Sequence, residues 1–268
     1  MIKNVSFISL IVTLLIVTGQ VAASEKLTIA AASDLRYALT DIIALYKKDH
    51  PEQVVEVVFG SSGKMTNQIM NGAPYDVFFS ADISYPEKLH TAGFTAGKVT
   101  AYALGRIVLW SHKKDASQLK LEDFLDASIK RIAIANPIHA PYGVRAKEAL
   151  QAAGLWDAVQ HKLVFGENIA RTAQMIESEA ADVGIIALSL ALFPGLTRHG
   201  YRLIDDHLHH PLTQAYVVTQ YGEANKAALA FVRFMEKEPV HTIMKQYGFS
   251  FPKKPAKGSL FNEKMFVN

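Results

Sequence analysis

The sequence contains no cysteine at all. This absence excludes a disulfide framework, a thiol nucleophile and the lipobox cysteine to which a lipid anchor would be attached. We therefore expect a soluble mature chain without cross-links or lipid. A chain of 268 residues, half of them hydrophobic, is long enough to fold on the burial of apolar surface alone.

The sequence has little excess charge of either sign. Lys and Arg number 28 and Asp and Glu number 25, which gives a net charge of +3. The basic residues are scattered and are not interleaved with aromatic residues. Because nucleic-acid binding needs a concentrated basic surface, we expect no nucleic-acid partner.

No hydrophobic run is long enough to cross a membrane as a helix. The most apolar run covers residues 5–17, follows Lys3 and precedes Val21-Ala22-Ala23. It is shorter than the ~20 residues that a spanning helix needs, which disfavours a membrane anchor. A basic start, a short apolar core and small residues near the cleavage position are typical of a secretory signal peptide. We predict a signal peptide over residues 1–23, cleavage near Ala23 and a periplasmic location.

Common catalytic motifs are also missing. There is no Gly-x-Ser-x-Gly elbow and no His-Glu-x-x-His helix. Residues 60–66 faintly resemble a Walker A loop, but Val58 stands where its first glycine belongs and Met65 where it needs Ser or Thr. We expect no catalytic residues and no enzyme, and a secreted hydrolase is kept only as an unsupported alternative.

Hydrophobic patterns alternate between strand and helix from residue 27 onward. Expected strands and helices follow one another as two α/β units of similar size. The first has the order strand, helix, strand, helix, strand, which predicts a parallel sheet covered by helices on both faces. We predict an α/β fold of two lobes with a hinge and a cleft between them. The predicted limits are lobe 1 at 24–103 with a return at 213–252, lobe 2 at 104–212, and a tail at 253–268.

Small polar residues recur where an expected strand ends and a helix begins. There are four such junctions, at residues 29–34, 59–65, 135–143 and 165–169. A helix N-terminus offers free N–H groups and the positive end of the helix dipole. We expect the four helix starts to converge on one small anion. A tetrahedral oxyanion has only acceptors, and serine, tyrosine and backbone N–H groups are neutral donors that suit it.

Several stretches together resemble one family. They are Ala30-Ala31-Ala32-Ser33, Gly60-Ser61-Ser62-Gly63, the run 72–82, Pro137 with the run 142–150, and Asn168-Ile169 ahead of 181–185. These motifs are similar to those of the periplasmic molybdate-binding proteins of ABC importers, the ModA family, over about residues 26–252. The resemblance implies a type II periplasmic binding fold that captures molybdate or tungstate without a cofactor or protein-bound metal cation. It also implies delivery to a membrane permease, and we expect a monomer.

The resemblance also implies which residues bind the oxyanion. By position these are Ser33, Ser62, Tyr142 and Ile169, the last through its backbone N–H, with Ser61 as a second choice to Ser62. Many family members have a tyrosine ligand at the position of Ala187, and here Tyr142 is expected to replace it. The preference between molybdate and tungstate stays open, and a sulfate or phosphate receptor of the same fold is the alternative.

Three features have a structural interpretation beside a functional one. Ser33 would be a good N-cap for the helix after it. Asp34 suits a solvent-facing partner of the helix dipole, although it could instead accept a proton from hydrogen phosphate. The cluster Asp205-Asp206-His207-Leu208-His209-His210 resembles a metal site, and a polar loop at the return crossing between lobes explains it better.

Overall fold

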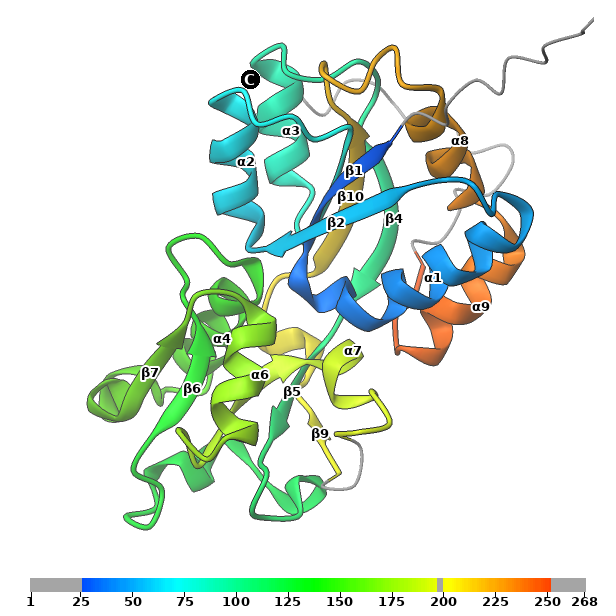
Figure 1. The fold of residues 1–268 in the computed structure, drawn as a ribbon. Coiled ribbons are helices and arrows are strands. Elements are labelled where there is room, and N and C mark those ends of the chain that lie inside the picture. The colour runs from blue at the N-terminus through cyan, green and yellow to red at the C-terminus, as the bar shows by residue number, and fades with distance from the viewer. Residues whose placement is uncertain (1–25, 197–199, 252–268) are drawn as a thin grey trace, which may run out of the picture.

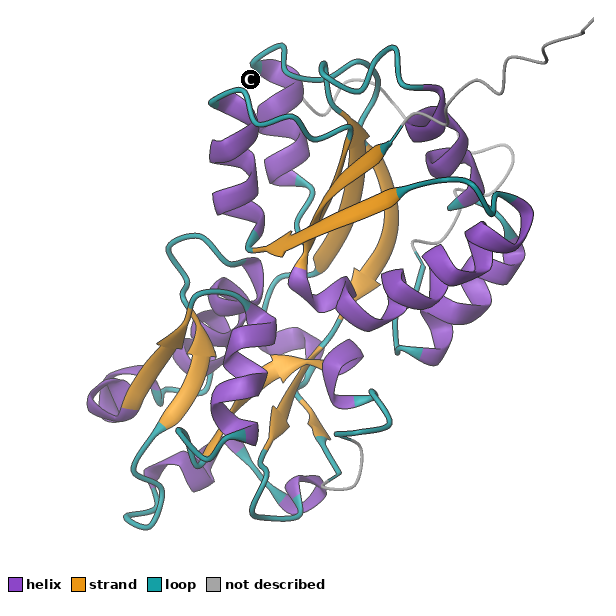
Figure 2. Cartoon of the chain, in the orientation of Figure 1, coloured by secondary structure: helices purple, strands orange, loops and turns teal. Residues whose placement is uncertain are grey.

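The computed structural model describes residues 26–196 and 200–251. Two lobes lie one above the other, and each is built on its own five-stranded sheet (Figure 1). Helices lie outside the sheets and loops gather where the two lobes face each other (Figure 2). The described part of the chain thus has the predicted two-lobed α/β architecture.

The first lobe has the strand order β2-β1-β3-β10-β4. Its strands are β1 Leu27–Ala32, β2 Val55–Gly60, β3 Val77–Ser80, β4 Thr100–Gly105 and β10 Leu212–Val218. The interior strand β1 is mostly apolar and almost wholly buried, whereas the edge strand β2 alternates half-buried valines with exposed positions. This is the pattern expected for a sheet covered on both faces at its centre.

Helices cover both faces of this first sheet. A short 3-10 turn η1 (Ser33–Leu35) leads into α1 (Arg36–Asp49). Helices α1, α8 (Lys226–Phe234) and α9 (Glu238–Gln246) pack over one hydrophobic cluster. Helices α2 (Ser62–Met70) and α3 (Ser84–Thr91) lie over a smaller cluster on the other face (Figure 1).

The second lobe has the strand order β7-β6-β8-β5-β9. Its strands are β5 Ile107–Trp110, β6 Ile132–Ala135, β7 Leu163–Gly166, β8 Val183–Ala187 and β9 Arg202–Leu203. Its α-helices are α4 Pro141–Ala152, α5 Trp156–Val159, α6 Ile169–Glu177 and α7 Leu188–Ala191. Short 3-10 turns lie at 116–118, 121–125, 160–162 and 206–208. One continuous core of buried apolar side chains fills this lobe.

The parallel sheet predicted from the first unit is confirmed for β1, β2 and β3, but one strand in each lobe runs antiparallel to its neighbours. Strand β10 runs antiparallel to β3 and β4, and β5 runs antiparallel to β8 and β9. These are the strands that follow the two crossings between lobes. The chain leaves the first sheet at Gly105 and enters the second at Ile107 with only Arg106 between them. The chain therefore passes from one sheet directly into the other without an intervening helix.

Two predicted segments, the signal peptide 1–23 and the tail 253–268, lie outside the described residues. Within the described ranges, no helix has both the length and the apolar character needed to cross a membrane.

Candidate anion-binding site

All four predicted junctions meet at the boundary between the lobes. They line a small cavity of about 10 Å³. That volume is about the least that holds one water molecule and lies far below the roughly 300–1,000 Å³ of pockets for drug-sized ligands, so the site suits only a small ligand. The cavity is lined by Ala32, Ser33, Asp34, Gly60, Ser61, Ser62, Ala81, Ala140, Pro141, Tyr142 and Ile169. The five predicted ligands are all in this set, and both lobes contribute to it.

The Ser33 hydroxyl joins the two lobes directly. Its Oγ donates to Oδ1 of Asn168 (3.0 Å) and accepts from the N–H of Ala170 (3.2 Å) in α6. Ser33 itself begins the turn η1 and does not cap α1 through its side chain, so the N-cap interpretation is wrong. To donate to an anion in the cavity, this hydroxyl has to turn away from Asn168.

The two serines at the start of α2 have different neighbours. Ser62 is fully buried, and its Oγ accepts from the N–H of Ala81 (3.0 Å), the residue after β3. That contact leaves the hydroxyl hydrogen of Ser62 free to donate toward the cavity. The Oγ of Ser61 lies 2.9 Å from Nδ1 of His139 in the other lobe. The structure therefore supports Ser62 over Ser61 as the more available hydroxyl donor.

The start of α6 has one unused backbone donor. Asn168 is the N-cap residue, and its Oδ1 accepts from the N–H of Arg171 (2.9 Å). The N–H of Ala170 is used by Ser33. The Ile169 N–H, at the first helical position, has no acceptor among the described residues, although Ile169 is buried. It is available to an anion, as the free N–H groups of helix starts commonly are.

Tyr142 lies at the second position of α4 and is buried beside a second lining residue, Asp34. Its Oη donates to Oδ2 of Asp34 (3.0 Å). Nε2 of Gln214, from β10, donates to the same Oδ2 (2.6 Å) and lies 3.1 Å from the phenol oxygen. Oε1 of Gln214 in turn accepts from the hydroxyl of Tyr102 in β4 (2.6 Å). This network fixes the phenol at the edge of the cavity, while Ala187 does not line it.

Asp34 is the one carboxylate that lines the cavity. Burial raises its pKa from 3.8 to about 6, although the hydrogen bonds from Gln214 and Tyr142 oppose this rise. Its second oxygen, Oδ1, is buried without a hydrogen-bond partner. The interpretation of Asp34 as a solvent-facing helix-dipole residue is wrong, because only 1% of it is exposed.

Other contacts between the lobes surround the cavity. Arg145 of α4 forms an ion pair with Asp82 (2.6 Å), and both side chains are mostly buried. Lys64 of α2 pairs with Glu167 (2.6 Å) at the surface. The N–H of Gly63 donates to the backbone oxygen of His139 (2.9 Å). The lobes are thus in contact on several sides of the cavity.

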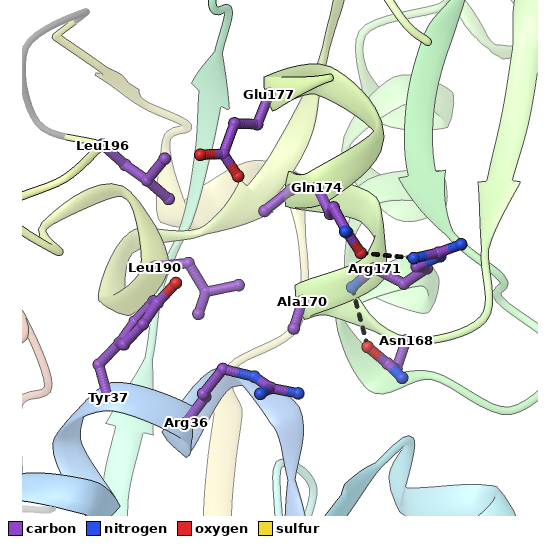
Figure 3. A pocket seen from close by; sticks show the side chains of 10 residues that line it. Arg36, Tyr37, Asn168, Ala170, Arg171, Gln174, Glu177, Leu190 and Leu196 are labelled. Atoms are coloured by element: carbon purple, nitrogen blue, oxygen red, sulfur yellow. Dashed lines mark hydrogen bonds between the residues drawn. The ribbon is translucent and has the colours of Figure 1, made fainter. Parts of the chain in front are cut away.

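A larger pocket lies beside this cavity, between α1 and α6. Figure 3 shows Arg36 and Tyr37 on α1 facing Asn168, Arg171 and Glu177 around α6. Nη1 of Arg171 donates to Gln174 (2.5 Å), so the guanidinium lies along the surface of its own helix. Arg171 does not line the smaller cavity.

Sequence reasoning assigned no role in the site to four residues that organise it. Asn168 accepts a hydrogen bond from the Ser33 hydroxyl, and the N–H of Ala81 donates to the Ser62 hydroxyl. Gln214 donates to the Asp34 carboxylate and accepts from the Tyr102 hydroxyl. The sequence signal for Gln214 was a polar residue in a mostly apolar strand. The Asp205–His210 cluster lies in the return crossing, as the polar-loop interpretation expects. No group of three His, Asp or Glu side chains able to hold a metal occurs in 26–196 and 200–251.

Comparison with known proteins supports one family. The sequence profile of the bacterial extracellular solute-binding proteins matches residues 27–250. The molybdate-binding protein ModA of Azotobacter vinelandii is 34% identical over 230 residues, 85% of this chain and 91% of that protein. ModA of Rhodobacter capsulatus is 31% identical over 85% of this chain and 89% of its own length.

A solved structure is similar over the same region. The periplasmic molybdate-binding protein of Azotobacter vinelandii superimposes with a TM-score of 0.80 and 30% sequence identity, over 85% of this chain and all of that one. The expected periplasmic binding fold is thereby confirmed. The chain belongs to the bacterial extracellular solute-binding proteins and, among them, to the ModA family.

Proposed function

We propose that this protein captures molybdate or tungstate in the cavity between its lobes and delivers the anion to the permease of an ABC importer. Ser33 and Ser62 supply hydroxyl donors, Tyr142 supplies a phenol in place of the tyrosine missing at Ala187, and Ile169 supplies a backbone N–H. The Ser61 hydroxyl is the second choice to that of Ser62 as a donor.

The observation that supports this proposal most is the chemistry of the cavity lining. Apart from Asp34 and Tyr142 the lining residues are not titratable, and no lysine, arginine or histidine lies among them. Hydroxyl groups and helix N-termini are therefore the donors available for an anion. The relatives named molybdate-binding protein make molybdate the first ligand to test.

The rest of the proposal follows from this role. The protein acts by binding and release and not as an enzyme, and it needs no cofactor. It works as a periplasmic monomer exported by the signal peptide 1–23, without nucleic-acid contacts. The lobes extend over 24–103 with 213–252 and over 104–212, and they open and close about the two crossings between them.

A thermal melt of the ligand-stripped mature protein tests the proposal. A ligand at about 1,000 times its Kd stabilises the native state by about 4 kcal/mol, which raises Tm measurably. We expect molybdate and tungstate to raise Tm, and sulfate and phosphate to leave it unchanged. A rise in Tm with sulfate or phosphate alone would make that anion the ligand in place of molybdate. No change in Tm with any of the four anions would refute an oxyanion receptor.

Replacing Ser62 by alanine should weaken molybdate binding by about 1–3 kcal/mol, because a charged acceptor loses one donor. The effect is measured by titration calorimetry. Ser61→Ala is the matched control, because its hydroxyl is engaged by His139, and it should lose less affinity. If the two variants bind alike, or if Ser61→Ala is the weaker, Ser62 is not the principal hydroxyl donor of α2.

A further inference from the structure

Asp34 is the feature of the cavity that the proposed ligand does not explain. It is a buried carboxylate at the edge of a site meant for a dianion, and no positively charged side chain lines the cavity with it. Its carboxylate accepts from Tyr142 of α4 and from Gln214 of β10, which Tyr102 of β4 holds in place, and the backbone N–H groups of Asp34 and Leu35 also favour its ionised form. Ser189 of α7 donates to the backbone oxygen of Asp34. None of them is cationic. An ionised Asp34 and a bound dianion would therefore repel each other at short range.

The hydrogen atoms of this network can be counted. Tyr102 donates to Oε1 of Gln214, which fixes the amide so that its Nε2 faces Asp34 and Tyr142. The Nε2 group donates to Oδ2 of Asp34 and to the phenol oxygen of Tyr142, and the phenol has one hydrogen of its own to donate. That hydrogen is donated to Oδ2 of Asp34. While Asp34 is ionised, the Tyr142 hydroxyl is engaged by the protein and is not free for an anion.

One proton added to Asp34 removes its repulsion of the anion and also frees the Tyr142 hydroxyl. A proton on Oδ2 of Asp34 removes the negative charge and lets the carboxyl group donate to the phenol oxygen. The phenol hydrogen then turns to the anion. The proton comes from the solvent or buffer, and it returns there when the anion leaves.

We propose that Asp34 makes oxyanion binding proton-coupled: one proton from solvent enters the Asp34–Tyr142 pair for each molybdate bound, so that Tyr142 can donate to the ligand. This inference rests on the proposed function. It assigns Asp34 a positioning role, acting on the ligand through Tyr142. The raised pKa of Asp34, about 6 before an anion is present, supports it, because a dianion nearby raises the pKa further.

The test is titration calorimetry of molybdate at pH 7.5 in three buffers of different ionisation enthalpy. The dependence of the observed enthalpy on the buffer enthalpy gives the number of protons taken up. We expect the wild type to take up close to one proton per molybdate bound and Asp34→Asn to take up none. Between pH 7 and 8.5 the wild-type Kd should rise about tenfold per pH unit, as linkage to one proton requires. The pKa of His139 is lowered by burial, so His139 stays neutral over this range.

Asp41→Asn is the matched control, because Asp41 accepts from Tyr247 (2.7 Å) in a second Asp–Tyr pair that does not line the cavity. It should retain the proton uptake of the wild type. In infrared difference spectra, the C=O band of a protonated carboxyl group should appear when the wild type binds molybdate. Tight binding without proton uptake and without that band would overturn the inference and leave the proposed function standing. No molybdate binding by the wild type would overturn both.

Discussion

Replacing Gly63 with valine should weaken molybdate binding about 100-fold while leaving each lobe intact. A Cβ at Gly63 would lie 2.8 Å from the backbone oxygen of His139 and 3.0 Å from its Cα, across the boundary between the lobes. Backbone atoms cannot turn aside as a side chain can, so the lobes cannot approach as they do here. Overpacking of this kind costs about 1–3 kcal/mol, and valine at a backbone contact belongs at the upper end.

The measurement is titration calorimetry with molybdate beside a thermal melt of the ligand-free variant. Valine is tolerated in a helix, so Tm without ligand should stay close to that of the wild type. Gly97→Val is the matched control, because a Cβ there meets no atom within 4 Å, and its affinity should be unchanged. Normal binding by Gly63→Val would show that the ligand is held without closure of the lobes.

Proline at position 169 should weaken molybdate binding by about 3 kcal/mol, or roughly 150-fold, the scale found when a fixed donor to an oxyanion is removed. Proline is the substitution that deletes the Ile169 N–H. The first position of a helix accepts proline, and Asn168 before it already has the extended backbone (φ −149°, ψ 174°) that a following proline favours. The proline ring also fills the space that a water molecule would need to replace the N–H.

The control for this variant separates the donor from the side chain. Ile169 is buried in the core of the second lobe, so proline also removes packing. Ile169→Ala removes the same packing and keeps the N–H. By titration calorimetry, Ile169→Ala should bind molybdate at least ten times more tightly than Ile169→Pro. Equal affinities of the two variants would contradict a role for this N–H.

Local patterns in the sequence were sufficient to locate the cavity lining. Strand 54–59 followed by the serines of α2, and strand 163–165 followed by Asn168-Ile169, are junctions that hydrophobic periodicity can identify. The strands β2 and β7 end at Gly60 and Gly166, beside those predicted helix starts. Because parallel strands of one sheet end at the same edge, the junctions within each lobe had to lie together.

The hydrogen-bond partners within the site were not predictable in this way. Tyr142 and Asp34 are 108 positions apart, and Gln214 and Asp34 are 180 apart. Such pairs depend on how the two lobes meet, which periodicity within a segment does not report. The same applies to Ser33, whose hydroxyl bonds to Asn168 across the lobes and does not cap its own helix. Asp34 was predicted to be exposed because it lies in the first turn of a helix. It is buried because the second lobe covers it.

The central claim is that one tetrahedral anion lies between the two lobes, against Ser33, Ser62, Tyr142 and Ile169. A crystal structure of the protein with molybdate, phased or checked by the anomalous signal of molybdenum, tests it most directly. We predict one strong molybdenum peak in the cavity, with its oxygens within hydrogen-bonding distance of the Ser62 hydroxyl and the Ile169 N–H. A peak at any other place, or a cavity without one in crystals soaked at saturating molybdate, would contradict the account.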